Sequence, residues 1–183
     1  MDQPTYLPLL NSIAVNEAKG EKLLSAWAAT AQDPGLAAAL RFVAIREGEH
    51  AMAFTKRMCE LGYEVCEETA FQVFKDFDKL VGIAKSPMSD VEKLAKLAPP
   101  DSGEPRKDPF RGFFNDTTID PQTGELLGRY IAEERDSGRR LQCEYDRVRA
   151  SGGASNMEMQ SLKASIEALR QEVAKLTRVR SVA

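Results

Sequence analysis

A glutamate and a histidine three positions apart stand inside an otherwise apolar helical pattern. The pattern repeats at alternate spacings of three and four residues between Gly35 and Tyr63, and Glu47 and His50 occupy two of its positions. This spacing brings the two side chains together on one helical face. Ionisable side chains on a buried face are costly unless a partner compensates them. Carboxylate oxygens and a neutral imidazole are ligands of iron, manganese and zinc, so a metal ion is the first partner to consider.

Two more glutamates occupy apolar faces of other predicted helices. Glu17 lies in a helix predicted over residues 7–31, and Glu134 lies in one predicted over residues 121–149. A glycine follows each glutamate by about one helical turn, and the first of these, Gly20, leaves space beside the carboxylate. If the helices pack together, the sequence predicts a metal site built from Glu17, Glu47, His50 and Glu134.

Helical periodicity accounts for most of the chain and predicts an all-α fold. The predicted helices cover residues 7–31, 35–62, 69–85, 90–97 and 121–149. The turn at Asp33-Pro34-Gly35 is so short that the first two helices should pack as an antiparallel hairpin. The sequence Ser89-x-x-Glu92 predicts a capping box for the short helix. A loop is predicted for the segment rich in Pro, Gly and Asp that follows, tethered to the core by Phe110, Phe113 and Phe114.

The last part of the chain is predicted to form a separate element. A flexible break at Ser151–Ala154 precedes a helix with an apolar heptad pattern. The heptad residues are Met159, Leu162, Ile166, Leu169, Val173 and Leu176. Their branching pattern favours a parallel two-stranded coiled coil, although the helix could instead pack back on its own bundle. We therefore divide the chain into a bundle over residues 1–150 and a C-terminal helix over residues 151–183, and expect a homodimer or higher homo-oligomer.

Composition excludes several other classes of protein. The formal net charge of −3 gives no electrostatic reason to expect a nucleic acid or an anionic membrane as partner. The three cysteines are too few and too scattered for a disulfide framework or a Cys-x-x-Cys metal site. No apolar run approaches the length of a membrane span, and the first residues lack the pattern of a signal peptide. We expect a cytoplasmic protein.

The first two predicted helices resemble a known family. The segment from Asn16-Glu17-Ala18 through Ala26-Trp27-Ala28 to Ala44-x-x-Glu47-x-x-His50-Ala51 is similar to the first half of a ferritin-like, rubrerythrin-type diiron domain. The similarity covers about residues 7–62, and the bundle plan extends it to about residue 149. It implies a ferritin-like antiparallel four-helix bundle with a C-terminal coiled-coil-type helix. It also implies that iron is held by the four residues Glu17, Glu47, His50 and Glu134.

The second half of the chain departs from the family pattern. Where the family's third helix carries a glutamate, the nearest candidates here are Asp76 and Asp78. Ser137 stands three residues after Glu134, where the family has a second histidine, and His50 is the only histidine in the chain. The rubredoxin-like iron knot of rubrerythrins is absent, because the chain has no Cys-x-x-Cys pair.

Three interpretations of these residues stay open. The first is a partial carboxylate–histidine site that binds iron, or manganese or zinc, and supports oxidation of ferrous iron or peroxide and oxygen chemistry. The second is a site completed by another copy of the chain. In the third, the metal site is lost, the buried polar groups pair with one another or with Arg46 or Arg135, and the protein is a helical scaffold or adaptor. The remaining acidic residues nearby, Glu49, Glu133 and Asp136, are expected to be solvated.

Overall fold

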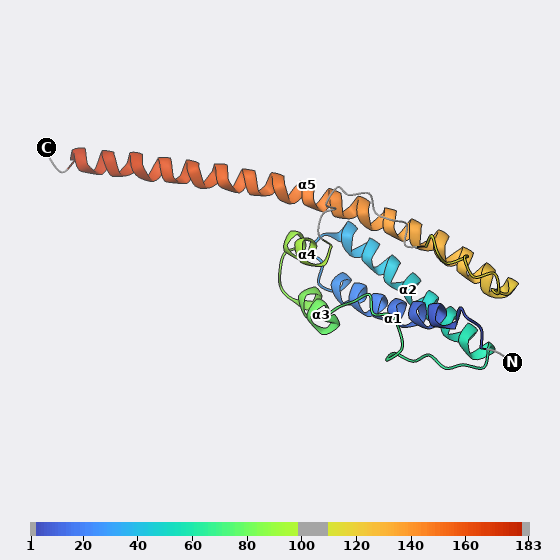
Figure 1. The fold of residues 1–183 in the computed structure, drawn as a ribbon. Helices are drawn as coiled ribbons and strands as arrows, with labels where there is room; N and C mark the ends of the chain where they lie inside the picture. Colours follow the sequence, from blue (N-terminus) through green and yellow to red (C-terminus); the bar gives the residue numbers. More distant parts are fainter. Residues whose placement is uncertain (1–2, 99–109, 181–183) are drawn as a thin grey trace. The chain divides into compact units, whose positions relative to one another are not determined.

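Helices make up most of the part of the chain that the structure describes. The computed structural model describes residues 3–98 and 110–180, except for the side chains of residues 153–164 and 168–180. Its helices are α1 (Leu7–Ala28), α2 (Pro34–Glu60), α3 (Phe77–Lys85), α4 (Asp90–Leu97) and α5 (Pro121–Arg180) (Figure 1). No strand occurs among these residues, which confirms the predicted all-α class. The chain divides into two compact units, residues 1–145 and 146–183.

The first two helices form the predicted antiparallel hairpin. Asp33 caps the start of α2, because its side chain accepts a hydrogen bond of 2.8 Å from the backbone N–H of Leu36. Gly62, with a positive φ of 85°, follows the end of α2 and provides the left-handed residue that commonly ends a helix. Glu17 on α1 contacts His50 on α2, and Gly20 lies against Glu47 one turn further along. Contact partners therefore run in opposite directions along the two helices, as an antiparallel pair requires.

The first part of α5 lies against both helices of the hairpin (Figure 1). Arg57 near the end of α2 bonds Thr123 near the start of α5, whereas Arg46 bonds Asp136 further along, so α5 runs antiparallel to α2. It therefore runs parallel to α1. The chain between α2 and α5, which includes α3 and α4, joins these two antiparallel helices and is longer than their direction requires.

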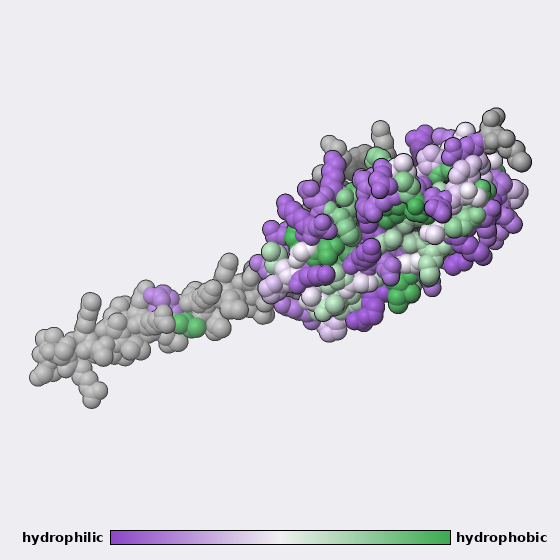
Figure 2. All heavy atoms as spheres, turned by 90° about the horizontal axis from the view of Figure 1, so that it is seen from below, coloured by the Kyte–Doolittle hydropathy of each residue, from purple (hydrophilic) through white to green (hydrophobic). Residues whose placement is uncertain are grey.

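The core of the first unit lies at the junction of α1, α2 and α5. Its buried residues are Tyr6, Leu7, Leu10, Ile13, Ala14, Phe54, Met58, Leu127, Tyr130 and Ile131. Phe110 and Phe113 pack on Tyr130 with ring centroids 5.9 and 6.4 Å away, so two of the three predicted loop tethers are confirmed. Phe114 is 53% exposed and does not serve as the third. On the face shown in Figure 2, small hydrophobic areas lie among hydrophilic side chains.

The prediction of a helix over residues 69–85 is wrong for the first half of this range. Only Phe77–Lys85 is helical, and Asp76 before it has a left-handed backbone with φ 53°. The preceding segment instead follows α1. Ser12 Oγ accepts a hydrogen bond from the backbone N–H of Phe71, and the Asn16 side chain accepts from Val73 N–H and donates to the Phe71 carbonyl. These side-chain partners satisfy an irregular backbone that would otherwise favour a helix.

The short helix α4 has the predicted capping box. The Ser89 side chain accepts from the backbone N–H of Glu92, and the Glu92 side chain accepts from the backbone N–H of Ser89. The Lys93 ammonium group, on a fully buried side chain, donates to Thr30 Oγ1 at 2.7 Å. These contacts attach α4 to the end of α1.

The predicted break at Ser151–Ala154 is also wrong, because these residues are helical within α5. Glycine lowers helix propensity by about 1 kcal/mol relative to alanine, which need not end a helix when strong helical sequences flank it on both sides. Of the heptad side chains only Ile166 is described, and it is 44% exposed in the single chain. No helix in the described residues is both long enough and apolar enough to cross a membrane.

Candidate metal centre

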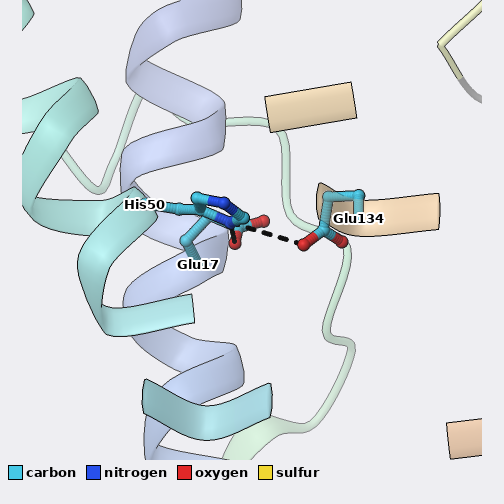
Figure 3. Close-up of side chains that lie close together, drawn as sticks. All are labelled: Glu17, His50 and Glu134. Carbon is cyan, nitrogen blue, oxygen red and sulfur yellow. Dashed lines mark hydrogen bonds and ion pairs between the residues drawn. The ribbon is translucent and has the colours of Figure 1, made fainter. Parts of the chain in front are cut away.

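Three of the four predicted ligands meet at one point in the first unit. Glu17 from α1, His50 from α2 and Glu134 from α5 each offer one ligand atom, and these atoms lie within 4.8 Å of one another (Figure 3). His50 Nδ1 lies 3.1 Å from Glu17 Oε2 and 3.4 Å from Glu134 Oε1. The Glu17 and His50 side chains are buried, and that of Glu134 is 19% exposed. The three helices therefore converge on these residues as their apolar stripes predict.

The fourth predicted ligand, Glu47, stands beside this group. Burial raises the pKa of the Glu47 carboxyl to about 9, and the carboxylates of Glu17 and Glu134 add to the effect because like charges repel. A Cβ atom at Gly20 would overlap the Glu47 carboxylate. The space that Gly20 leaves in α1 is therefore filled by a glutamate from α2 and not by its own neighbour, Glu17.

His50 has a carboxylate partner at each ring nitrogen. Nδ1 faces Glu17 and Glu134, and Nε2 lies 2.8 Å from Glu133 Oε2. Burial lowers the pKa of His50, but contacts with the carboxylates of Glu134, Glu17 and Glu133 outweigh it and raise that pKa to about 10. In the metal-free chain the imidazole is therefore an imidazolium that compensates a cluster of negative charge.

Glu133 was expected to be solvated, and that expectation is wrong. Besides its contact with His50, its carboxylate accepts a hydrogen bond of 3.0 Å from Arg129 Nε. Its place next to Glu134 lies outside the narrow apolar stripe, but position 133 follows Tyr130 by three residues and so shares its helical face. A wider definition of the inward face would have included it.

Tyr130 is a site residue that the sequence did not single out. Its hydroxyl donates a hydrogen bond of 2.8 Å to Glu17 Oε1, and its ring meets that of His50 edge-on at 5.0 Å. Burial raises the pKa of Tyr130, and the nearby carboxylates raise it further, so the phenol stays neutral and keeps its proton as a donor. It lies one helical turn before Glu134, which is the only sequence signal that could have found it.

Ser137, three residues after Glu134, is not directed at the cluster. Ser137 is buried and accepts a hydrogen bond of 3.1 Å from Arg46 Nη1. Arg46 also forms an ion pair of 2.9 Å with Asp136, which is therefore only partly solvated. Arg135 lies over the ring of Phe110, 5.9 Å from its centroid. Arg46 therefore pairs with Asp136 and not with the predicted ligands, which argues against its part in the lost-site interpretation.

The remaining acidic candidates lie outside the cluster. Asp76 and Asp78 are exposed at the start of α3, so the third helix of this chain supplies no carboxylate to the site. Glu49 is exposed, as expected. The chain thus brings together three glutamates and one histidine as candidate ligands, with Glu133 and Tyr130 supporting them.

One atom of the cluster is left without a hydrogen bond. Glu134 Oε1 is buried and accepts none, although it lies within ion-pair distance of His50. A buried carboxylate oxygen without a donor is unfavourable, and a cation is one group that would compensate it. Histidine ligands of metals usually donate their second ring N–H to a carboxylate, as His50 Nε2 can to Glu133. The donor set therefore fits a divalent transition-metal ion.

Comparisons with protein-family models, with curated proteins and with solved structures find no match to this chain. The similarity to rubrerythrin-type domains therefore stays a prediction from the sequence. Any function assigned to this chain rests on the geometry of the cluster.

Because His50 and Glu47 hold their protons tightly, stability of the metal-free chain should fall at alkaline pH. Their pKa values are raised from 6.5 to about 10 and from 4.5 to about 9, so the folded chain keeps protons that the unfolded chain has released. The stabilisation is complete at a pH below the pKa values of the unfolded chain. It is lost as the pH rises through the pKa values of the folded chain. Urea unfolding of metal-free protein at several values between about pH 6 and about pH 10 measures this. A free energy of unfolding that rises over this range would contradict it.

Proposed function

We propose that this protein binds a divalent transition-metal ion, with iron preferred over manganese or zinc, through Glu17, Glu47, His50 and Glu134. The observation that carries the proposal is the buried convergence of Glu17, His50 and Glu134 from three different helices, with Glu134 Oε1 left without a hydrogen bond. Bound iron would supply oxidation chemistry with dioxygen or peroxide, of which oxidation of ferrous iron is the simplest form.

Each residue has a distinct role in this proposal. His50 offers Nδ1 to the metal and is oriented by Glu133 at Nε2. Glu17 is oriented by the hydroxyl of Tyr130. Glu47 and Glu134 are the less constrained carboxylates. Glu47 and His50, whose pKa values are raised to about 9 and about 10, lose their protons when a cation binds. Binding should therefore release protons, and the apparent metal affinity should rise with pH.

The proposed fold type is a ferritin-like bundle in a cytoplasmic protein. Its support is the α1–α2 hairpin, followed by a long connection and by the first part of α5 running parallel to α1. Ferritin-like bundles contain one such long connection. In this chain the third helix of the bundle would be represented only by the short α3, which explains why it contributes no ligand.

Metal content tests the proposal directly. Protein purified without chelators, or loaded anaerobically with ferrous iron and desalted, should retain about one metal ion per chain. Elemental analysis measures the retained metal, and mixing the loaded protein with air tests for ferrous oxidation. Retention below about a tenth of an equivalent of iron, manganese and zinc alike would refute metal binding.

A specific observation supports a second candidate, the helical scaffold without metal. Each nitrogen of His50 already faces a carboxylate, and Glu17 is hydrogen-bonded by both His50 and Tyr130. Such a network can compensate its own charge without an ion. The same loading experiment separates the two candidates, because a scaffold retains no metal.

Both candidate functions, metal binding and the helical scaffold, include self-association through the C-terminal helix. We expect deletion of residues 154–183 to convert a dimer or higher oligomer to a monomer, because the deletion removes the predicted heptads. Light scattering of the full and shortened chains measures this. An unchanged solution mass would contradict an assembly role, and metal retained by the shortened monomer would exclude a site shared between two copies.

A further inference from the structure

A large cavity in the first unit joins the surface to the candidate metal centre. Its volume is about 650 Å³. Its lining includes the carboxyl groups of Glu17, Glu47 and Glu134, of which Glu17 is 6% exposed, and the side chains of Phe71 and Val73, which are 76% and 61% exposed. We call the exposed part at Phe71 and Val73 the mouth and the part at the three glutamates the floor.

The walls between these ends are almost entirely apolar. They are formed by Leu9 and Ile13 of α1 and by the aromatic side chains of Phe74, Phe110 and Phe113. A cavity of this size can enclose most of a small organic molecule, and apolar walls with a few polar groups at one end are typical of such sites.

The polar side chains near the mouth already have partners within the protein. Ser12 and Asn16 bind the backbone of Phe71 and Val73, and hold this segment along α1. Their hydrogen bonds hold the backbone of this segment, while the side chains of Phe71 and Val73 line the cavity and stay largely exposed. The irregular segment that replaces the predicted helix is thus the element that forms the entrance.

We propose that this cavity binds an uncharged, apolar organic molecule whose buried end lies beside Glu47 and Glu134. The walls favour an apolar body, and the lining offers an anion no cationic side chain to offset its loss of hydration. Binding in the cavity needs no metal. The role of the bound molecule as a substrate or ligand of the metal rests on the proposed function.

Two fluorescent probes with the same aromatic body test the proposal. N-phenyl-1-naphthylamine is uncharged, whereas 8-anilinonaphthalene-1-sulfonate carries one negative charge. Titration of the metal-free full chain should show at least about tenfold tighter binding of the uncharged probe. Equal affinities, or no saturable binding of the uncharged probe, would overturn the proposal.

Substitutions at the mouth locate the binding. The pair Phe71→Ser and Val73→Ser should weaken binding of the uncharged probe by about fivefold or more, because both side chains lie on the route to the floor. The matched control is the pair Ile45→Ser and Met52→Ser on α2, which are 60% and 68% exposed and do not line this cavity. An equal loss of probe affinity in the two double variants, or no loss in the Phe71 and Val73 variant, would show that the probe binds elsewhere and would refute the proposal.

Zinc loading separates this inference from the proposed function. In protein shown to retain zinc, the cation should reduce the discrimination against the anionic probe, because it offers the anion a cationic partner at the floor. Unchanged discrimination in zinc-loaded protein would refute placement of the ligand beside the metal. Protein that retains no zinc, iron or manganese but binds the uncharged probe through the mouth would refute metal binding while supporting the cavity.

Discussion

Replacement of His50 by alanine is expected to abolish metal retention and to lower the free energy of unfolding by about 3 kcal/mol near neutral pH. The imidazole supplies the only nitrogen ligand of the cluster and, in the metal-free chain, the cation between Glu17, Glu133 and Glu134. Its removal leaves Glu17 and Glu134 in a largely buried position with no cation beside them. Elemental analysis after ferrous loading and urea unfolding of the metal-free protein measure the two effects.

The control for this variant is Glu49→Ala on the same helix. Glu49 is next to His50 in sequence but is exposed, so its replacement should change neither metal retention nor stability by a measurable amount. The free energy of unfolding of the His50→Ala chain should also fall less towards alkaline pH, because the variant has no imidazolium that can release a proton. If the variant retained iron as wild type does, His50 would not be a ligand. A loss of stability without any metal binding in the wild type would favour the scaffold.

Substitution of Gly20 by alanine should weaken metal binding by about tenfold or more without adding any charge. A Cβ at this position would overlap the Glu47 carboxylate and lie 3.0 Å from its Cδ, so the glutamate has to move away from the cluster. Displacement of one ligand removes at least one good contact with the ion. A loss of about 1.4 kcal/mol in binding free energy corresponds to a tenfold lower affinity. Competition against a metal-sensitive dye measures the affinity of the purified chain.

Gly138 provides the matched control on α5. It follows Glu134 by about one turn, as Gly20 follows Glu17, but a Cβ there would meet no atom of another described element within 4 Å. Gly138→Ala should therefore leave metal affinity unchanged and raise stability by about 0.5–1 kcal/mol through helix propensity. If both variants weakened metal binding equally, the effect at Gly20 would not arise from Glu47.

Much of the local structure follows from the order of residues along the chain. The bounds of α1, α2 and α4, the cap at Asp33 and the left-handed Gly62 all depend on side chains within a few residues of one another. The same is true of the inward direction of Glu17, His50 and Glu134, because a helix of known period places each on a definite face. For this reason the candidate site could be predicted without the fold.

The predictions that failed depend on contacts between distant parts of the sequence. The segment before α3 has an apolar helical period, yet Ser12 and Asn16, more than fifty positions away, bind its backbone in an irregular form. Its departure from helix opens the mouth of the cavity. Nothing in the local sequence shows that these two side chains would be available as partners.

Within the site, the sequence alone determined that Glu17, His50 and Glu134 point inward, and the tertiary structure decided what each of them meets. It placed Glu47 in the space at Gly20, gave His50 a second carboxylate in Glu133, and aimed Tyr130 at Glu17. Helical periodicity specifies a direction for each side chain, because it arises from backbone bonds four residues apart. The distances between side chains on different helices depend instead on how those helices pack, which only the folded chain fixes.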